Sequence, residues 1–174
     1  MGAIEIMNEA ALERMRRVCQ LAADTLVMVG RRLEPGMTTD DINTLVHDYT
    51  VEHDAIPSPL NYKGYPKSVC TSVNEVVCHG IPGKRVLNEG DIINVDVTSY
   101  MPPTNGFHGD TSATFYVGTP TDTAKRVVEV SRHRRHRKWN FASCYYRRQS
   151  ITIRCPKIHW RTYCEWLRRG PAWK

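Results

Sequence analysis

Residues 90–117, GDIINVDVTSYMPPTNGFHGDTSATFYV, decide the fold of this 174-residue chain. Two runs rich in β-branched and aromatic residues, 91–100 and 108–117, flank the segment MPPTNG. A segment of Pro, Asn and Gly between two such runs predicts a β-hairpin. Apolar and polar residues alternate along the first run, so its strand is expected to have one apolar and one polar face.

The polar faces of the two predicted strands each carry an aspartate. Asp96 alternates with valines in the first strand, and Asp110 shares a face with His108 and Ser112 in the second. If the strands pair in register, the hairpin brings the two carboxylates within reach of each other. Such carboxylates repel unless a cation lies between them or one is protonated, and oxygen ligands suit hard or borderline divalent ions. The pattern indicates a metal site, and the alternative is two aspartates that face solvent on an edge of the sheet.

The sequence before the hairpin predicts two helices, short strands and loops. Apolar residues recur every three or four positions over residues 8–29 and 39–49, which is the spacing of amphipathic helices. The period changes at residue 68, and short strands are expected over 68–72 and 75–79. His79 ends the second of these strands and enters a loop, where substrate-contacting residues are commonly placed.

The composition of the chain changes abruptly after residue 130. Residues 1–130 hold 11 Lys/Arg against 17 Asp/Glu, whereas residues 131–174 hold 13 Lys/Arg against one acid and all four tryptophans. A third helix is expected to begin at Thr123 and to lose its apolar pattern in the basic run that follows. The change predicts a domain over 1–130 and an unpatterned Arg/Trp-rich basic tail over 131–174.

Membrane-spanning and secreted classes of protein are not indicated. No window approaches 18 consecutive apolar residues, and the N-terminus lacks the apolar core of a secretory signal. Cys19, Cys70 and Cys78 are sparse and not in CxxC spacing, which is typical of reduced thiols. We therefore expect a cytoplasmic protein with no membrane partner.

Three motifs carry a resemblance to a known family. The segment YKGYPKSVCTSVNEVVCHGIP (residues 62–82), followed by GDIINVDVT and GFHGDTSATF, resembles the type I methionine aminopeptidases, which are pita-bread metallopeptidases of family M24. The resemblance extends over residues 1–130. It implies an α+β fold, the N-terminal half of a pita-bread domain, with an antiparallel sheet and two helices on one face. It also implies a hydrolase that removes the initiator methionine from nascent polypeptides, with the ribosome as a further partner.

The resemblance implies roles for individual residues. Family members hold two divalent ions (Co, Mn, Fe or Zn) with two Asp, one His and two Glu side chains, and these ions activate water and polarise the peptide carbonyl. Asp96 matches the aspartate that chelates one ion, and Asp110 matches the aspartate that bridges both. His79 matches the catalytic, substrate-binding histidine that contacts the scissile peptide. The pocket for the methionine side chain is matched by Tyr62, Tyr65 and Cys70.

The chain departs from the family after residue 130. Residues 131–174 contain no match to the family's GHGIG-type segment with its metal-binding histidine. They also contain no match to the two metal-binding glutamates, since Glu165 is the one acid there. Three of the five ligands implied by the resemblance are thus missing. We expect the chain to be truncated in its catalytic half and to be inactive or nearly so.

Residues 131–174 have three open interpretations. Basic residues interleaved with tryptophan and tyrosine are compatible with an RNA- or ribosome-binding tail on a non-catalytic pita-bread half. A zinc site is a second hypothesis, although the spacing of its ligands matches no known zinc pattern; its residues would be Cys144, Cys155, His159 and Cys164. The third interpretation is translation out of frame or a decayed gene, because acidic residues become rare after residue 130 while Arg, Trp and Cys all become more frequent.

Overall fold

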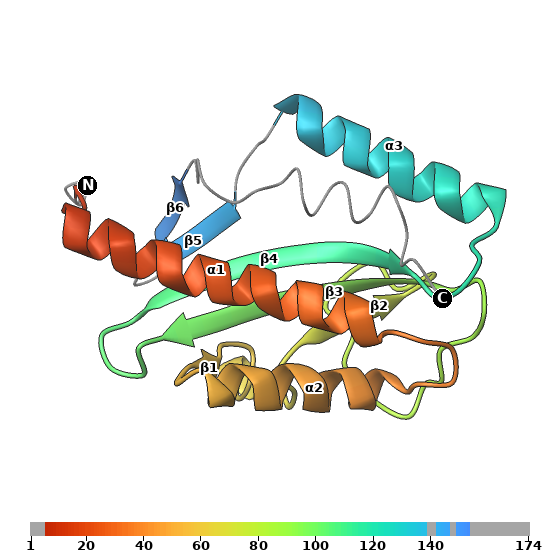
Figure 1. The fold of residues 1–174 in the computed structure, drawn as a ribbon, viewed down its shortest axis with the longest axis horizontal. Helices are drawn as coiled ribbons and strands as arrows, with labels where there is room; N and C mark the ends of the chain where they lie inside the picture. The colour runs from red at the N-terminus through yellow and green to blue at the C-terminus, as the bar shows by residue number, and fades with distance from the viewer. Residues whose placement is uncertain (1–5, 139–141, 147–148, 154–174) are drawn as a thin grey trace.

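The computed structural model describes residues 6–138, 142–146 and 149–153 (Figure 1). Helix α1 spans Glu9–Arg32, and its N-cap Asn8 accepts a hydrogen bond from the amide of Ala11 at 2.9 Å. Helix α2 spans Thr39–Glu52 and begins with a capping box between Thr38 and Asp41. Both helices begin where the apolar periodicity of the sequence predicts them.

The strands that the structure describes form one six-stranded antiparallel sheet. The predicted hairpin is its centre, with β3 and β4 paired over their full length. β1 and β2 pair with the other edge of β3, β5 pairs with β4, and β6 pairs with β5. The strands are β1 (Ile56–Pro57), β2 (Cys70–Val73), β3 (Ile92–Met101), β4 (Phe107–Tyr116), β5 (Ala142–Tyr146) and β6 (Gln149–Ile153). A short 3-10 helix, η1 (Tyr62–Gly64), precedes β2.

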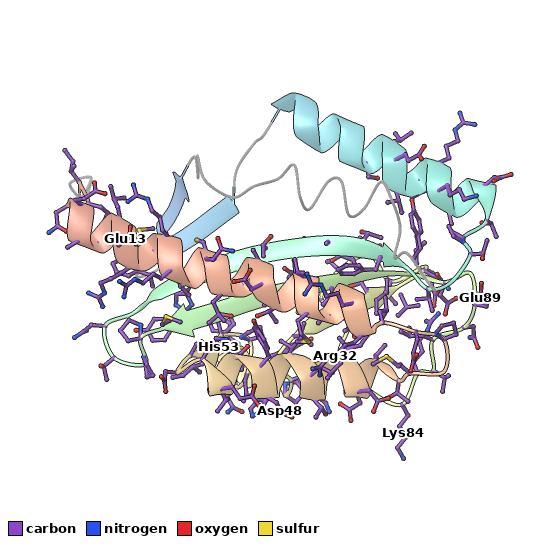
Figure 2. The ribbon with its side chains drawn as sticks, in the orientation of Figure 1. Glu13, Arg32, Asp48, His53, Lys84 and Glu89 are labelled. Atoms are coloured by element: carbon purple, nitrogen blue, oxygen red, sulfur yellow. The ribbon has the colours of Figure 1, made fainter. Side chains whose placement is uncertain are left out.

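Helices α1 and α2 cover one face of the sheet (Figure 1). The main core forms between them and the apolar faces of β2, β3 and β4, and its fully buried side chains include Ala22, Ile42, Val46, Ile93, Val95 and Val97. Gly109 on β4 allows α1 to approach closely, because a Cβ there would collide with the backbone of Val18. Charged side chains such as Glu13 and Asp48 project from the outer surfaces of the two helices (Figure 2). The expected α+β arrangement with two helices on one face is confirmed.

Helix α3 spans Asp122–Lys138 and stands apart from the sheet (Figure 1). Its side chains Val127 and Val130 are 53% and 48% exposed. The boundary predicted at residue 130 falls inside this helix. Within the tail, the end of α3 and the strands β5 and β6 are regular structure that the sequence pattern does not indicate.

Two expectations about local structure are wrong. Residues 75–79 form a turn and irregular backbone instead of a strand, because Asn74 takes a left-handed conformation (φ 49°) that turns the chain sharply after β2. Cys19 is disulfide-bonded, whereas Cys70 and Cys78 are free thiols, so the expectation of reduced cysteines fails for Cys19. The zinc hypothesis for the tail rests on side chains outside the described residues. No helix in the described part of the chain is long and apolar enough to cross a membrane.

Candidate metal and substrate site

Asp96 and Asp110 lie on the same face of the β3–β4 hairpin, the face opposite to α1 and α2. Asp96 pairs with Ser112, and Asp110 pairs with Thr98. Residues that pair directly across antiparallel strands project to the same face, and the two aspartates are therefore diagonal neighbours, about 7–8 Å apart or less. Both carboxylates are half-buried, on strands that have a partner on each side at these positions. The arrangement differs from the alternative of two aspartates at a solvent-exposed sheet edge.

Cys70 lies beside this pair of carboxylates. It pairs directly with Asp96 across the β2–β3 ladder, and its side chain is 8% exposed. Burial raises the pKa of the Cys70 thiol, a hydrogen bond from Tyr65 opposes that shift, and the negative charges of Asp96 and Asp110 raise the pKa further. The electrostatic field of both aspartates therefore reaches the thiol.

Tyr65 connects the loop before β2 to the loop that follows it. Its hydroxyl donates to the carbonyl oxygens of Val69 (3.1 Å) and Gly80 (3.0 Å). Burial raises the pKa of Tyr65, and its hydrogen bond to Cys70 adds to the effect. Tyr62, by contrast, is 65% exposed. The structure thus anchors Tyr65 on Val69, the residue before Cys70, and leaves Tyr62 at the surface.

His79 projects from a loop that is tightly held against β2. Its backbone is left-handed (φ 52°), a conformation that costs a non-glycine residue energy and is common at functional sites. The next residue, Gly80, accepts a hydrogen bond from the amide of Thr71 at 2.9 Å, and a Cβ on Gly80 would collide with the carbonyl oxygen of Thr71. The His79 side chain is exposed. The loop therefore holds an accessible imidazole next to the strand that carries Cys70.

A contact between Ser58 and His108 is the feature that sequence reasoning missed. The Nδ1 atom of His108 lies 2.8 Å from Oγ of Ser58, and the imidazole ring packs 4.6 Å from the ring of Tyr100. Burial lowers the pKa of His108. Alternation along β4 already places His108 on the face of Asp110, but Ser58 comes from an irregular Pro-rich segment that offers no sequence signal.

The site as described supplies oxygen donors but an incomplete set of metal ligands. Across the residues whose side chains the structure describes, no group of three or more His, Cys, Asp or Glu side chains is arranged to hold a metal ion. Two carboxylates on one face nevertheless suit a divalent cation. Asp96 and Asp110 are the two aspartates to which the sequence resemblance assigns metal binding, and that assignment stays a prediction.

Comparison with known proteins identifies the family. Residues 13–137 match metallopeptidase family M24, and the chain belongs to that family. Methionine aminopeptidase 1D, mitochondrial, of Homo sapiens is 53% identical over 129 residues, which are 74% of this chain and 38% of that protein. Methionine aminopeptidase A of Synechocystis sp. is 50% identical over 129 residues, which are 74% of this chain and 50% of that protein.

A solved structure extends the likeness to the fold. Methionine aminopeptidase from Rickettsia prowazekii matches with a TM-score of 0.71 and 44% sequence identity, over 75% of this chain and 52% of that chain. The expected membership of the pita-bread metallopeptidases is confirmed. The chain spans about half, or less, of the length of each of these three proteins.

Proposed function

We propose that this chain provides the aspartate and substrate-side part of a methionine aminopeptidase site. Asp96 and Asp110 hold divalent metal, and the surface around Tyr65, Cys70 and His79 receives a polypeptide N-terminus that begins with methionine. The observation that carries the proposal is the placement of both aspartates on one sheet face, with Asp96 directly opposite Cys70. The names of the relatives, which are methionine aminopeptidases, support it.

The chemistry of the residues fits a divalent cation. Membership of family M24 implies use of a divalent metal, and carboxylate oxygens are suitable ligands for Mn, Co, Fe or Zn. The negative field of Asp96 and Asp110, which raises the pKa of Cys70, is one that a bound cation would neutralise. A divalent ion held here would supply Lewis-acid polarisation of a peptide carbonyl. The proposal includes two ions per site, as in the family.

The residues beside the aspartates suit a methionine side chain. The ordinary pKa values of a phenol and a thiol lie above 7, and burial raises those of Tyr65 and Cys70 further, so both groups are neutral near pH 7. A neutral ring and a neutral thiol can contact a thioether by shape and dispersion without desolvating a charge. His79 is exposed on a rigid loop, where it is available to contact the peptide bond of the bound N-terminus.

We expect little turnover from this chain alone. The histidine and two glutamates that the resemblance requires have no counterpart in its sequence, and two carboxylates position a metal ion poorly. An assay on a Met-Gly-Met peptide with added Mn or Co tests this expectation, with Asp110→Ala as the control. Equal, negligible rates for both chains support it. Turnover that Asp110→Ala abolishes would overturn the expected inactivity and establish the chain as an aminopeptidase.

The basic tail favours a second candidate function. Residues 131–174 carry 13 Lys/Arg against one acid, a charge that attracts RNA or the ribosome. Binding to RNA should weaken as salt rises and should disappear when residues 131–174 are deleted. Binding that is insensitive to both changes contradicts this candidate. The predicted cytoplasmic location rests on the sequence alone and stays a prediction.

The coding DNA offers a test of the out-of-frame interpretation of the tail. Translation beyond codon 130 in the other two frames should yield a GHGIG-like segment if residues 131–174 are out of frame. If neither frame yields such a segment, the out-of-frame interpretation is wrong, and the RNA- or ribosome-binding interpretation of the tail becomes the one to test.

A further inference from the structure

The corner of the sheet around Asp110 is a ring of contacts between three segments. On β3, the Thr98 hydroxyl donates to Oδ1 of Asp110 at 3.2 Å, and the Thr98 carbonyl accepts from the amide of Ser58 at 2.8 Å. The Ser58 hydroxyl in turn lies 2.8 Å from Nδ1 of His108. His108 precedes Asp110 by two residues on β4, so both side chains project to the same face.

The geometry of Thr98 suits it to orient the Asp110 carboxylate. Thr98 and Asp110 pair directly across the β3–β4 ladder, so their side chains are immediate neighbours. A β-branched side chain in a strand has few rotamers, which holds the hydroxyl in a fixed direction. Its hydrogen bond engages Oδ1 of Asp110. Carboxylates that bind metal ions are commonly oriented by such outer hydrogen bonds.

We propose that Thr98 is a positioning residue that fixes the rotation of the Asp110 carboxylate for metal binding, and that the Ser58–His108 pair braces it. This inference rests on the proposed metal-binding function and deepens it. Ser58 begins the segment that leads through η1 to Tyr65. The brace therefore links the orientation of the proposed metal-binding carboxylate to the start of the segment that carries Tyr65.

Substitutions at Thr98 separate positioning from a purely structural role. Thr98→Val keeps the shape of the side chain and removes the hydroxyl, whereas Thr98→Ser keeps the hydroxyl. We expect Thr98→Val to weaken Mn²⁺ affinity by about tenfold, the usual effect of losing an outer hydrogen bond to a metal ligand. Thr98→Ser should bind Mn²⁺ as the unchanged chain does. Affinity is measured on the full chain by titration of the EPR signal of free Mn²⁺.

Thr114→Val is a matched control. Thr114 lies on β4, the partner strand of β3, and its hydroxyl accepts a cross-strand hydrogen bond from Asn94 at 3.2 Å, so it does not contact a site carboxylate. It should leave Mn²⁺ affinity unchanged while lowering thermal stability about as much as Thr98→Val does. Equal losses of Mn²⁺ affinity in the two variants would overturn the positioning role.

Two further variants keep the inference distinct from the function on which it rests. Asp110→Asn should abolish most Mn²⁺ binding; if it does so while Thr98→Val binds normally, the positioning role is wrong and the metal site stands. If Asp110→Asn itself binds Mn²⁺ normally, the proposed metal site is wrong. Ser58→Ala leaves β3 untouched and should cause a smaller loss of affinity than Thr98→Val. An unchanged affinity would overturn the brace through His108.

Discussion

Cys70 lies directly opposite Asp96 in the β2–β3 ladder, so a buried free thiol and a half-buried carboxylate share one face of the sheet. This relationship places the wall of the proposed methionine pocket beside the proposed metal ligands. Burial is the first cause of the raised pKa of the thiol. A neutral Cys70 is what a pocket for an uncharged thioether requires.

The first prediction concerns the reactivity of the two free cysteines. Cys70 is buried with a raised pKa, whereas Cys78 is exposed. Since the thiolate is the reactive form, iodoacetamide at pH 8 should alkylate Cys78 faster than Cys70. Peptide mass spectrometry over time measures both rates in one sample. Equal rates for the two thiols would contradict the burial of Cys70 beside the aspartates.

A second prediction concerns the start of α2 and its dependence on pH. Hydrogen bonds from Thr38 lower the pKa of the Asp41 carboxyl. An aspartate with a lowered pKa in the folded state stabilises the fold at pH values above the ordinary pKa of aspartate. This stabilisation is lost as the pH falls through the pKa of the folded state. The urea midpoint of the unchanged chain should therefore fall more steeply than that of Asp41→Asn on acidification below about pH 4. Parallel pH profiles would show that the capping box contributes nothing through this carboxylate.

Thr38→Ala tests the same cap without a change of charge. Loss of an N-cap hydroxyl costs about 1 kcal/mol of stability. The expected result is a lower urea midpoint with an unchanged slope, because the substitution removes a local contact and leaves the core intact. Thr44→Ala is a suitable comparison, since the Thr44 hydroxyl only donates back to the Asp40 carbonyl within the helix. A loss as large in Thr44→Ala would argue against a specific capping role.

The loop that carries His79 supplies a third prediction. Gly80 has no room for a Cβ against the Thr71 carbonyl, whereas a Cβ on Gly83 would meet open space. Gly80→Ala should therefore displace the loop and weaken the hydrogen bond from the Thr71 amide, and Gly83→Ala should not. Hydrogen exchange at the Thr71 amide measures the effect, with faster exchange expected in Gly80→Ala alone. Similar exchange in the two variants would contradict the tight docking of the loop on β2.

The hairpin and its aspartates are predictable from sequence because the signal is local. Alternation in β3 fixes which face each residue occupies, and a ladder in register then places Asp96 and Asp110 on the same face. Helices α1 and α2 are predictable for the same reason, since the capping residues and the apolar spacing of each helix lie within its own short stretch of sequence. Family resemblance adds roles to these residues, but alternation together with the hairpin register places them on one face.

The parts that escape prediction depend on contacts between distant segments. The expected strand over 75–79 is absent because Asn74 turns the chain after β2, and Gly80 then packs on Thr71 in a close approach that strand propensity does not predict. The partnership of Ser58 with His108 joins residues 50 positions apart through an irregular segment. Strand β5 likewise pairs with β4 over His108–Asp110, a long-range contact with a segment in which the sequence shows no strand pattern.

Titration of the full chain with Mn²⁺ tests most directly the claim that Asp96 and Asp110 form a metal site. Asp48 is exposed on α2, on the covered side of the sheet, and Asp48→Asn serves as a charge-matched control (Figure 2). We predict saturable binding that Asp96→Asn and Asp110→Asn each weaken by more than about tenfold, since a direct ligand contributes at least as much as an outer hydrogen bond. Asp48→Asn should bind as the unchanged chain does. Normal Mn²⁺ affinity in either Asp96→Asn or Asp110→Asn would contradict the account.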